Sequence, residues 1–75
     1  MNKVRIILDQ WPDRRAIALD LGKPYPTVSG WYNRASIPAW HWGDLIAAAE
    51  RRGLAGVTLA DIAAAHNSER EGRAA

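Results

Sequence analysis

The chain of 75 residues contains no cysteine, and this absence excludes disulfide bonds and cysteine-ligated zinc. It has only two histidines, His41 and His66, which lie too far apart in the sequence to form a metal-ligand pattern. We therefore expect no metal site and no other cofactor. The lack of cysteine also fits the reducing conditions of a cytosol.

Long apolar runs are absent as well. The longest are only a few residues, whereas a membrane-spanning helix needs about 20 residues. No membrane partner is therefore expected. The first residues, Met1, Asn2 and Lys3, lack the apolar stretch of a secretory signal. Both features predict a cytoplasmic protein.

Basic residues only slightly outnumber acidic residues. Ten Lys and Arg against eight Asp and Glu give a formal net charge of +2, which permits a polyanionic partner without requiring one. The first half of the chain carries +3, and its basic residues flank residues 22–31. They are Lys3, Arg5, Arg14, Arg15, Lys23 and Arg34. No basic run is dense enough to indicate nucleic-acid binding by itself.

The length allows one small domain, which buries only about 60% of the surface that its unfolded chain exposes. Apolar residues recur at helical spacing and predict an all-α bundle of about five short helices, with no strand. The expected helices are residues 3–10, 14–21, 26–33, 38–52 and 59–66. We assign residues 1–66 to this domain. Residues 67–75 are polar without an apolar stripe, and we expect them to form a disordered tail.

The residues at the expected helix ends suit those positions. Asn2 and Asp13 can cap the first two helices, because their side-chain oxygens accept hydrogen bonds from free backbone N–H groups. Gly22 and Gly53 can end the second and fourth helices in the left-handed conformation. Pro38 suits the first position of the fourth helix, where its missing N–H costs nothing.

Thr58 and Asp61 predict a capping box ahead of the fifth helix. The side chains expected to form the core are Val4, Ile7, Leu8, Trp11, Ile17, Ala18, Leu21, Val28, Trp31, Trp42, Leu45, Ile46 and Ala49. Large side chains contribute most to a small core, so the tryptophans are expected to pack rather than to stack on bases. Trp40 either covers the end of the third helix or is exposed.

Residues 22–31, GKPYPTVSGW, combine two prolines with a glycine inside an apolar pattern. Lys23 and Tyr25 each precede a proline and are biased toward extended backbone, which predicts a turn followed by a helix that begins at Pro26. The outer face of that helix is then small and polar: Pro26, Ser29, Gly30 and Asn33. Glycine inside a helix lowers the stability of the helix by roughly 1 kcal/mol relative to alanine. A residue that is unfavourable for the local structure often belongs to a functional site.

A short helix, a glycine turn and a second helix between basic flanks have the layout of a helix-turn-helix. Ala18 lies four residues before Gly22, Val28 lies six after it, and Trp31 follows three later. At this spacing the segment resembles the helix-turn-helix of the lambda-repressor-like and Cro-like phage regulators.

The run SIPAWHW, residues 36–42, is similar to a phage-associated variety of these regulators, the carph-isopro type. The resemblance extends from Val4 to about Ile62. Pro24 and Pro26 depart from the family's pattern at the turn and at the start of the second helix. The resemblance implies a DNA-binding protein of the bacterial cytosol, associated with the nucleoid when bound, whose second motif helix enters the major groove.

The resemblance also implies roles for individual side chains. The expected base-reading residues are Tyr25, Pro26, Ser29, Gly30 and Asn33. The expected phosphate contacts are Arg14, Arg15, Lys23, Thr27, Arg34, Ser36 and His41, the last two near the N-terminus of the fourth helix, whose free N–H groups attract anions. The alternative for the first set is ordinary solvated helix residues. For the second set it is a salt-bridged surface, and for His41 a passive exposed side chain.

In the fifth helix, Leu59, Ile62 and Ala63 share one face, which His66 extends. A helix at the end of a small bundle commonly completes the core. In the regulators that the chain resembles it can also form a dimer contact, so a homodimer through Leu59, Ile62 and His66 is the alternative.

These features predict a sequence-specific regulator that binds double-stranded DNA, as a repressor of a phage or mobile element would. No Ser-His-Asp set, carboxylate pair or phosphate-binding loop is present, so no enzymatic activity is expected. The alternative is a protein-interaction module, such as an antitoxin-like or inhibitory helical domain. The small outer face of residues 26–33 disfavours it, because protein grooves favour exposed apolar or aromatic contacts.

Overall fold

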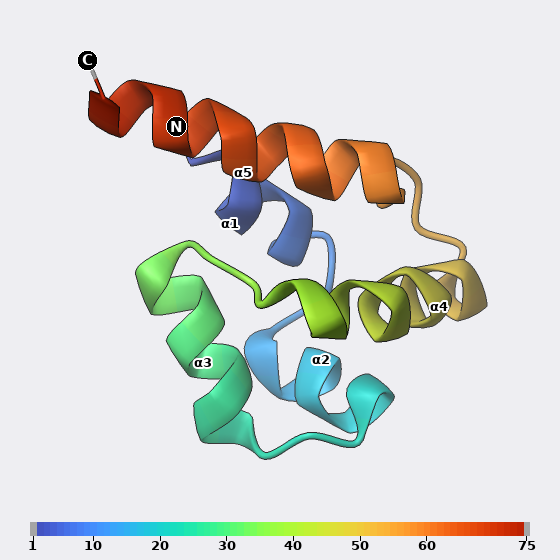
Figure 1. The fold of residues 1–75 in the computed structure, drawn as a ribbon. Coiled ribbons are helices and arrows are strands. Elements are labelled where there is room, and N and C mark those ends of the chain that lie inside the picture. Colours follow the sequence, from blue (N-terminus) through green and yellow to red (C-terminus); the bar gives the residue numbers. More distant parts are fainter. Residues whose placement is uncertain (1, 75) are drawn as a thin grey trace.

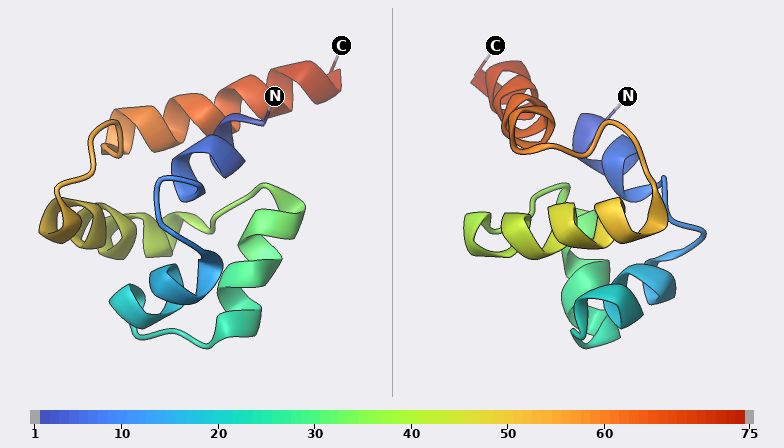
Figure 2. Two further views of the ribbon diagram at one scale, coloured as in Figure 1. Left: turned by 180° about the vertical axis from the view of Figure 1, so that it is seen from behind. Right: turned by 90° about the vertical axis from the view of Figure 1, so that its right-hand side faces the viewer.

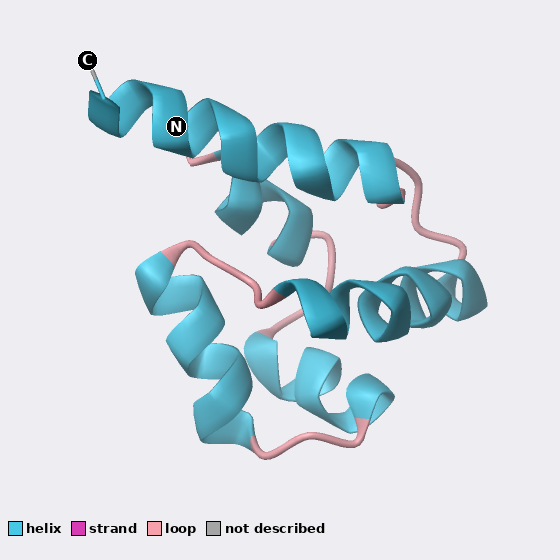
Figure 3. Ribbon diagram, in the orientation of Figure 1, coloured by secondary structure: helices cyan, strands magenta, loops and turns pink. Residues whose placement is uncertain are grey.

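The computed structural model describes the backbone of residues 2–74 and the side chains through residue 68. It contains five α-helices and one short 3₁₀ helix (Figures 1 and 3). They are α1 (Lys3–Leu8), α2 (Arg14–Leu21), α3 (Tyr25–Arg34), η1 (Ala39–His41), α4 (Trp42–Arg52) and α5 (Leu59–Ala74). No strand occurs in residues 2–74, so the predicted all-α fold is confirmed.

Side chains and glycines end several helices as predicted. The Asn2 and Asp13 side chains accept hydrogen bonds from backbone N–H groups three residues later, at 3.0 and 2.8 Å. Gly22 and Gly53 follow α2 and α4 with φ of 65° and 73°, a left-handed conformation that glycine adopts without strain. The backbone N–H of Asp61 donates to Thr58 Oγ1 at 3.1 Å, and that of Thr58 donates to Asp61 Oδ2 at 3.2 Å. The capping box is therefore confirmed.

Two helices begin or end away from the predicted residues for local reasons. α1 ends at Leu8 rather than Gln10, because the N–H groups of Gln10 and Trp11 turn back to the carbonyls three residues earlier. α3 begins at Tyr25, one residue before the predicted start, and extended Pro24 is its N-cap.

The prediction that Pro38 opens an α-helix was wrong. Pro38 has an extended backbone, with φ −56° and ψ 139°, and it precedes η1, so that α4 begins only at Trp42. The linker before it is held by side chains. The Ile37 N–H donates to His66 Nε2 at 2.9 Å, and the Ile37 carbonyl accepts from Trp42 Nε1 at 2.7 Å. This linker must therefore stay extended to keep both bonds.

The prediction of a disordered tail was also wrong for residues 67–74, because α5 continues to Ala74. Residue 75 lies outside the described residues. The segment has no proline, and its Glu, Arg and Ala residues are good helix formers, which favours continuation of the helix despite Gly72.

The core lies between two groups of helices. α1 packs against α5 on one side, α2 packs against α3 on the other, and α4 contacts both α2 and α5 (Figures 1 and 2). The buried side chains are Val4, Ile7, Leu8, Trp11, Ile17, Ala18, Val28, Trp31, Ala35, Ile37, Leu45, Ala48, Ala49, Val57, Ile62 and Ala65. Leu21, Trp42 and Ile46 are only half-buried against this core. Trp40 is 80% exposed, so it does not cover α3.

His66 joins α5 to the linker between α3 and η1. Its Nε2 faces the Ile37 N–H and its Nδ1 lies 2.8 Å from the carbonyl of Ile62. A backbone N–H can only donate and a carbonyl can only accept, so both contacts are hydrogen bonds in the tautomer that carries its proton on Nδ1. The ring also packs against Trp42, with centroids 5.0 Å apart.

This arrangement already uses part of the face that was considered for a homodimer for contacts within the chain. Ile62 is fully buried within the chain, and both ring nitrogens of His66 face backbone partners. Of the three residues, only Leu59 is exposed, at 61%. Ile62 therefore completes the core, which was the other reading of this helix.

Candidate nucleic-acid interface

α2 and α3 are joined by a tight turn at residues 22–24, and their axes cross (Figures 1 and 2). The N–H of Lys23 bonds to the carbonyl of Ala18 at 3.0 Å and closes the end of α2. Ala18 is buried, and its small side chain lets the two helices approach. α3 buries Val28 and Trp31, which leaves its opposite side facing away from the core.

The outward side of α3 carries the predicted base-reading residues. Tyr25, Pro26 and Asn33 are exposed, whereas Ser29 and Gly30 are half-exposed. Two arginines account for the partial cover. Arg14 Nη1 donates to Ser29 Oγ at 3.2 Å, and the Arg34 guanidinium lies over Gly30. The surface is thus polar, with one arginine against each of its two small residues.

Tyr32 organises a cluster that the sequence did not predict. The Arg14 guanidinium lies 4.2 Å from the centre of the Tyr32 ring, and that of Arg5 lies 5.6 Å from it. Asp9 accepts a hydrogen bond from the Tyr32 hydroxyl, and this bond, assisted by burial, raises the pKa of Tyr32 above its usual value. Arg14 is therefore held by internal contacts on two sides.

Arg5 ties α1 to the end of α3. Its Nε donates to the carbonyl of Tyr32 and its Nη2 to the carbonyl of Asn33, each at 2.9 Å. Carbonyls in the last turn of a helix have no partner within the helix, so a guanidinium fits there. Arg5 and Tyr32 lie 27 positions apart in the sequence, and no local signal marks this contact.

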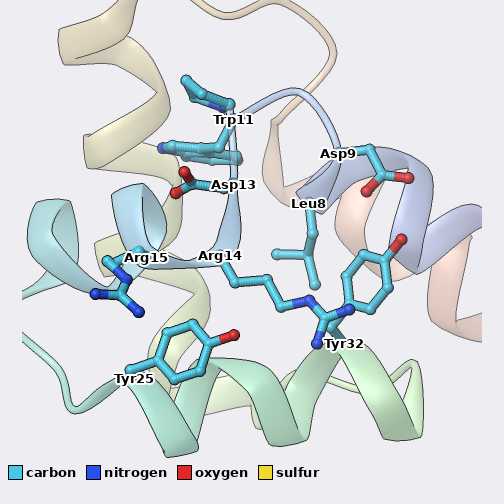
Figure 4. A pocket seen from close by; sticks show the side chains of 9 residues that line it. Leu8, Asp9, Trp11, Asp13, Arg14, Arg15, Tyr25 and Tyr32 are labelled. Carbon is cyan, nitrogen blue, oxygen red and sulfur yellow. The ribbon is translucent and has the colours of Figure 1, made fainter.

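A hollow of about 580 Å³ opens where α1, α2 and α3 meet (Figure 4). Its lining is Leu8, Asp9, Trp11, Pro12, Asp13, Arg14, Arg15, Tyr25 and Tyr32. The Arg15 guanidinium lies 5.5 Å from the centre of the Tyr25 ring at the α3 side. Two carboxylates and two guanidiniums share the hollow, so its charge does not select an anion alone.

The other predicted phosphate contacts lie at different ends of α3. Lys23 lies in the turn before α3 and Thr27 in its first turn. Arg34 and Ser36 lie at the far end, where the N–H of Ser36 bonds to the carbonyl of Trp31 at 3.0 Å. Lys23, Thr27 and Ser36 are not among the residues of the outward face described above.

His41 is the N-cap residue of α4, so it lies at the N-terminus of the fourth α-helix as predicted. It lies in η1 rather than in the first turn of a long helix, and its N–H bonds to the carbonyl of Pro38 at 3.0 Å. Its ring packs against Trp31, with centroids 4.9 Å apart, and against exposed Trp40 at 5.9 Å. No side-chain hydrogen bond caps the N-terminus of α4, and the phosphate contact there stays a prediction.

Two further arginines serve the fold. Arg51 Nη2 donates to the backbone carbonyl of Asp20 at 3.0 Å, and Arg52 forms an ion pair with the Asp20 carboxylate. Trp11 Nε1 donates to the same carboxylate at 3.0 Å. The hydrogen bond from Arg52, more than that from Trp11, holds the pKa of Asp20 below its usual value against the opposing effect of burial.

No group of three His, Cys, Asp or Glu side chains that could hold a metal ion occurs among the described residues. No helix within that part of the chain has both the length and the apolar character needed to cross a membrane. Comparisons of the chain with protein-family models, curated proteins and solved structures found no match.

Proposed function

We propose that the chain is a sequence-specific regulator that binds double-stranded DNA through a helix-turn-helix formed by α2 and α3. The observation that carries this proposal is the outward side of α3, where small and polar residues lie between basic side chains. The major groove, about 12 Å wide, admits an α-helix. A helix enters it closely only if its outer side chains are small, which Ser29 and Gly30 provide.

Ser29 and Asn33 are the proposed base readers. The Ser29 hydroxyl accepts a hydrogen bond from Arg14, which leaves its own proton to donate to an acceptor on a base edge. Asn33 has an exposed side chain, and an asparagine amide can bond to both N6 and N7 of adenine. Its backbone is fixed by Arg5, which keeps the amide close to one position.

Arg15, Lys23 and Thr27 are proposed to contact phosphates on either side of the groove. Such contacts position a protein on DNA and carry little sequence information. Arg14 would act mainly by orienting Ser29, because its guanidinium already has two partners in the chain. Regulation would follow from occupancy of an operator. The resemblance to phage regulators supports a repressor of a phage or mobile element.

The decisive experiment selects bound duplexes from a random DNA library and then measures affinity for the selected site over a range of salt concentrations. Binding releases condensed counterions, so the logarithm of the affinity should fall with that of the salt concentration by a slope of about −0.9 per phosphate contacted. The Lys23→Ala variant should flatten the slope by about one unit. Absence of salt-dependent binding to any duplex would refute the proposal and favour a protein-interaction module.

Base reading has its own test. Ser29→Ala and Asn33→Ala should each reduce discrimination between the selected site and a scrambled duplex, by roughly 1–3 kcal/mol for each good contact. Gln10→Ala is the matched control, because it removes an exposed amide outside α3. Equal losses on both duplexes would exclude base reading by these two residues.

A further inference from the structure

Gly30 and Arg34 form a pair on the outward side of α3. A Cβ atom placed on Gly30 would lie 3.0 Å from Arg34 Nη1 and 3.5 Å from both Cζ and Nη2. The guanidinium therefore lies along the helix, over the position where a side chain of residue 30 would stand. Helical side chains lean toward the preceding turn, so a residue four positions later is the natural one to fill that space.

Among the described residues, the Arg34 guanidinium has no ring contact of the kind that Arg15 makes with Tyr25, and it lacks the hydrogen bonds that four other arginines make. Arg5, Arg51 and Arg52 donate to carbonyl or carboxylate oxygens, and Arg14 donates to Ser29. Within the described part of the chain, no hydrogen bond or ion pair engages Arg34, which is exposed. Its planar fork of five donors is therefore available to an external acceptor.

The location of this fork indicates which acceptor it meets. Phosphates line the edges of the major groove, whereas the centre of an inserted helix face meets the edges of the bases. Arg34 lies over Gly30, next to Ser29 and on the same side as Asn33, so its guanidinium occupies the centre of the face. On a base edge, the partner that matches a planar pair of donors is guanine, which presents O6 and N7 as two acceptors.

We infer that Arg34 is a specificity-determining residue that reads a guanine in the major groove, and that the absence of a side chain at Gly30 gives its guanidinium room to lie against α3. The inference rests on the proposed function and replaces the phosphate contact first expected of Arg34. It also explains why a glycine is kept inside a ten-residue helix, where alanine would be the better helix former. Gly30 then acts as a positioning residue rather than as a base contact.

The first experiment uses the unmodified protein and its selected DNA site. Each guanine is replaced in turn by 7-deazaguanine, which lacks the N7 acceptor but pairs normally. We expect one position at which this replacement weakens binding severalfold, and at which exchange of the whole base pair weakens binding by roughly 5- to 150-fold.

The second experiment repeats the selection and the affinity measurements with four variants: Arg34→Lys, Arg34→Ala, Gly30→Ala and Arg51→Lys. Arg34→Lys keeps the charge and loses the fork, so it should lose the guanine preference at that position and keep the salt slope of the parent. Gly30→Ala keeps Arg34 but places a Cβ 3.0 Å from its Nη1, so the guanidinium must move slightly and the same preference should weaken to a smaller extent. Arg51→Lys is the matched control and should leave it unchanged, because Arg51 bonds to Asp20.

The outcomes separate this inference from the proposed function. In one outcome, the protein binds a preferred site, Arg34→Lys retains every base preference, and Arg34→Ala flattens the salt slope by about one unit. In that case Arg34 contacts a phosphate, and the inference is wrong. A selected site with no guanine sensitive to 7-deaza replacement would also overturn it. If no duplex is bound at all, both the proposed function and this inference fail.

Discussion

The C-terminal ends of α3 and α4 carry the same residue type with opposite results. Arg51 and Arg52 in the last turn of α4 are bound by Asp20, whereas Arg34 in the last turn of α3 lies over Gly30 without such a partner. Each position suits a cation, because helix C-termini carry partial negative charge. What separates them is Asp20 of α2, whose backbone carbonyl accepts from Arg51 and whose carboxylate pairs with Arg52, 31 and 32 positions away in the sequence. A count of charges cannot reveal which arginines serve the fold and which serve a surface.

The largest effect on stability is expected at Asp20. Asp20→Ala removes the acceptor shared by Trp11 and Arg52, and a hydrogen bond to a charged group contributes about 1.5–3 kcal/mol. Because this site is partly exposed, we expect the free energy of unfolding in urea to fall by roughly 1–3 kcal/mol. Glu50→Ala, an exposed carboxylate on α4, is the control and should change little. An Asp20→Ala variant as stable as the parent would mean that the contact between α2 and α4 does not depend on the ion pair.

A smaller effect should follow from acid. The pKa of Asp20 is lower in the folded state than its ordinary value of 3.8, so its contribution to stability is complete above that value and is lost as the pH falls through the folded pKa. The difference in unfolding free energy between the parent and Asp20→Ala should therefore be constant near about pH 6 and shrink below about pH 3.8. A difference in unfolding free energy that stays constant down to about pH 2 would show that the charge of Asp20 does not stabilise the contact between α2 and α4.

The two arginines of α4 should differ from each other. Arg52→Ala breaks the ion pair and should lower the melting temperature, though by less than Asp20→Ala does, because the Trp11 bond remains. Arg51→Ala removes one exposed bond to a backbone carbonyl and should lower it less still. Thermal melts at low and high salt check this order. Salt should reduce the effect of Arg52→Ala, since it screens exposed ion pairs.

The smallest effect on stability is expected at Arg34. Arg34→Ala removes an exposed side chain that has no hydrogen bond or ion pair within the described residues, and such surface changes usually stay within about 0.5 kcal/mol. Its unfolding free energy should match the parent in the urea experiment used for Asp20→Ala. A clear loss of stability would place Arg34 with the arginines of α4 and weaken the case for its role in DNA binding.

The parts of the fold that could be predicted from the sequence are those set by nearby residues. Caps at Asn2 and Asp13 and the left-handed ends at Gly22 and Gly53 depend on the chemistry of one or two residues, and all were right. The start of α4 depends instead on bonds between the Ile37 backbone and the side chains of His66 and Trp42, which no local pattern announces.

In the candidate site, too, the features set by nearby residues could be predicted and those set by tertiary packing could not. The small outer face of α3 follows from helical spacing, and its exposure is as predicted for Pro26 and Asn33. The cover of Ser29 by Arg14 could not be predicted, because it joins residues 15 positions apart through tertiary packing. The assignment of base and phosphate contacts remains a prediction.

The bond between Ile37 and His66 bears on when the protein can act during its own synthesis. These residues lie 29 positions apart, and the later one fixes the linker that follows α3. A ribosome that has translated α2 and α3 has therefore made the proposed DNA-binding surface but not yet the residue that secures its downstream end. We expect a nascent chain to gain a firmly held α3 only after His66 has emerged, so that premature termination before α5 leaves the surface present but unsecured.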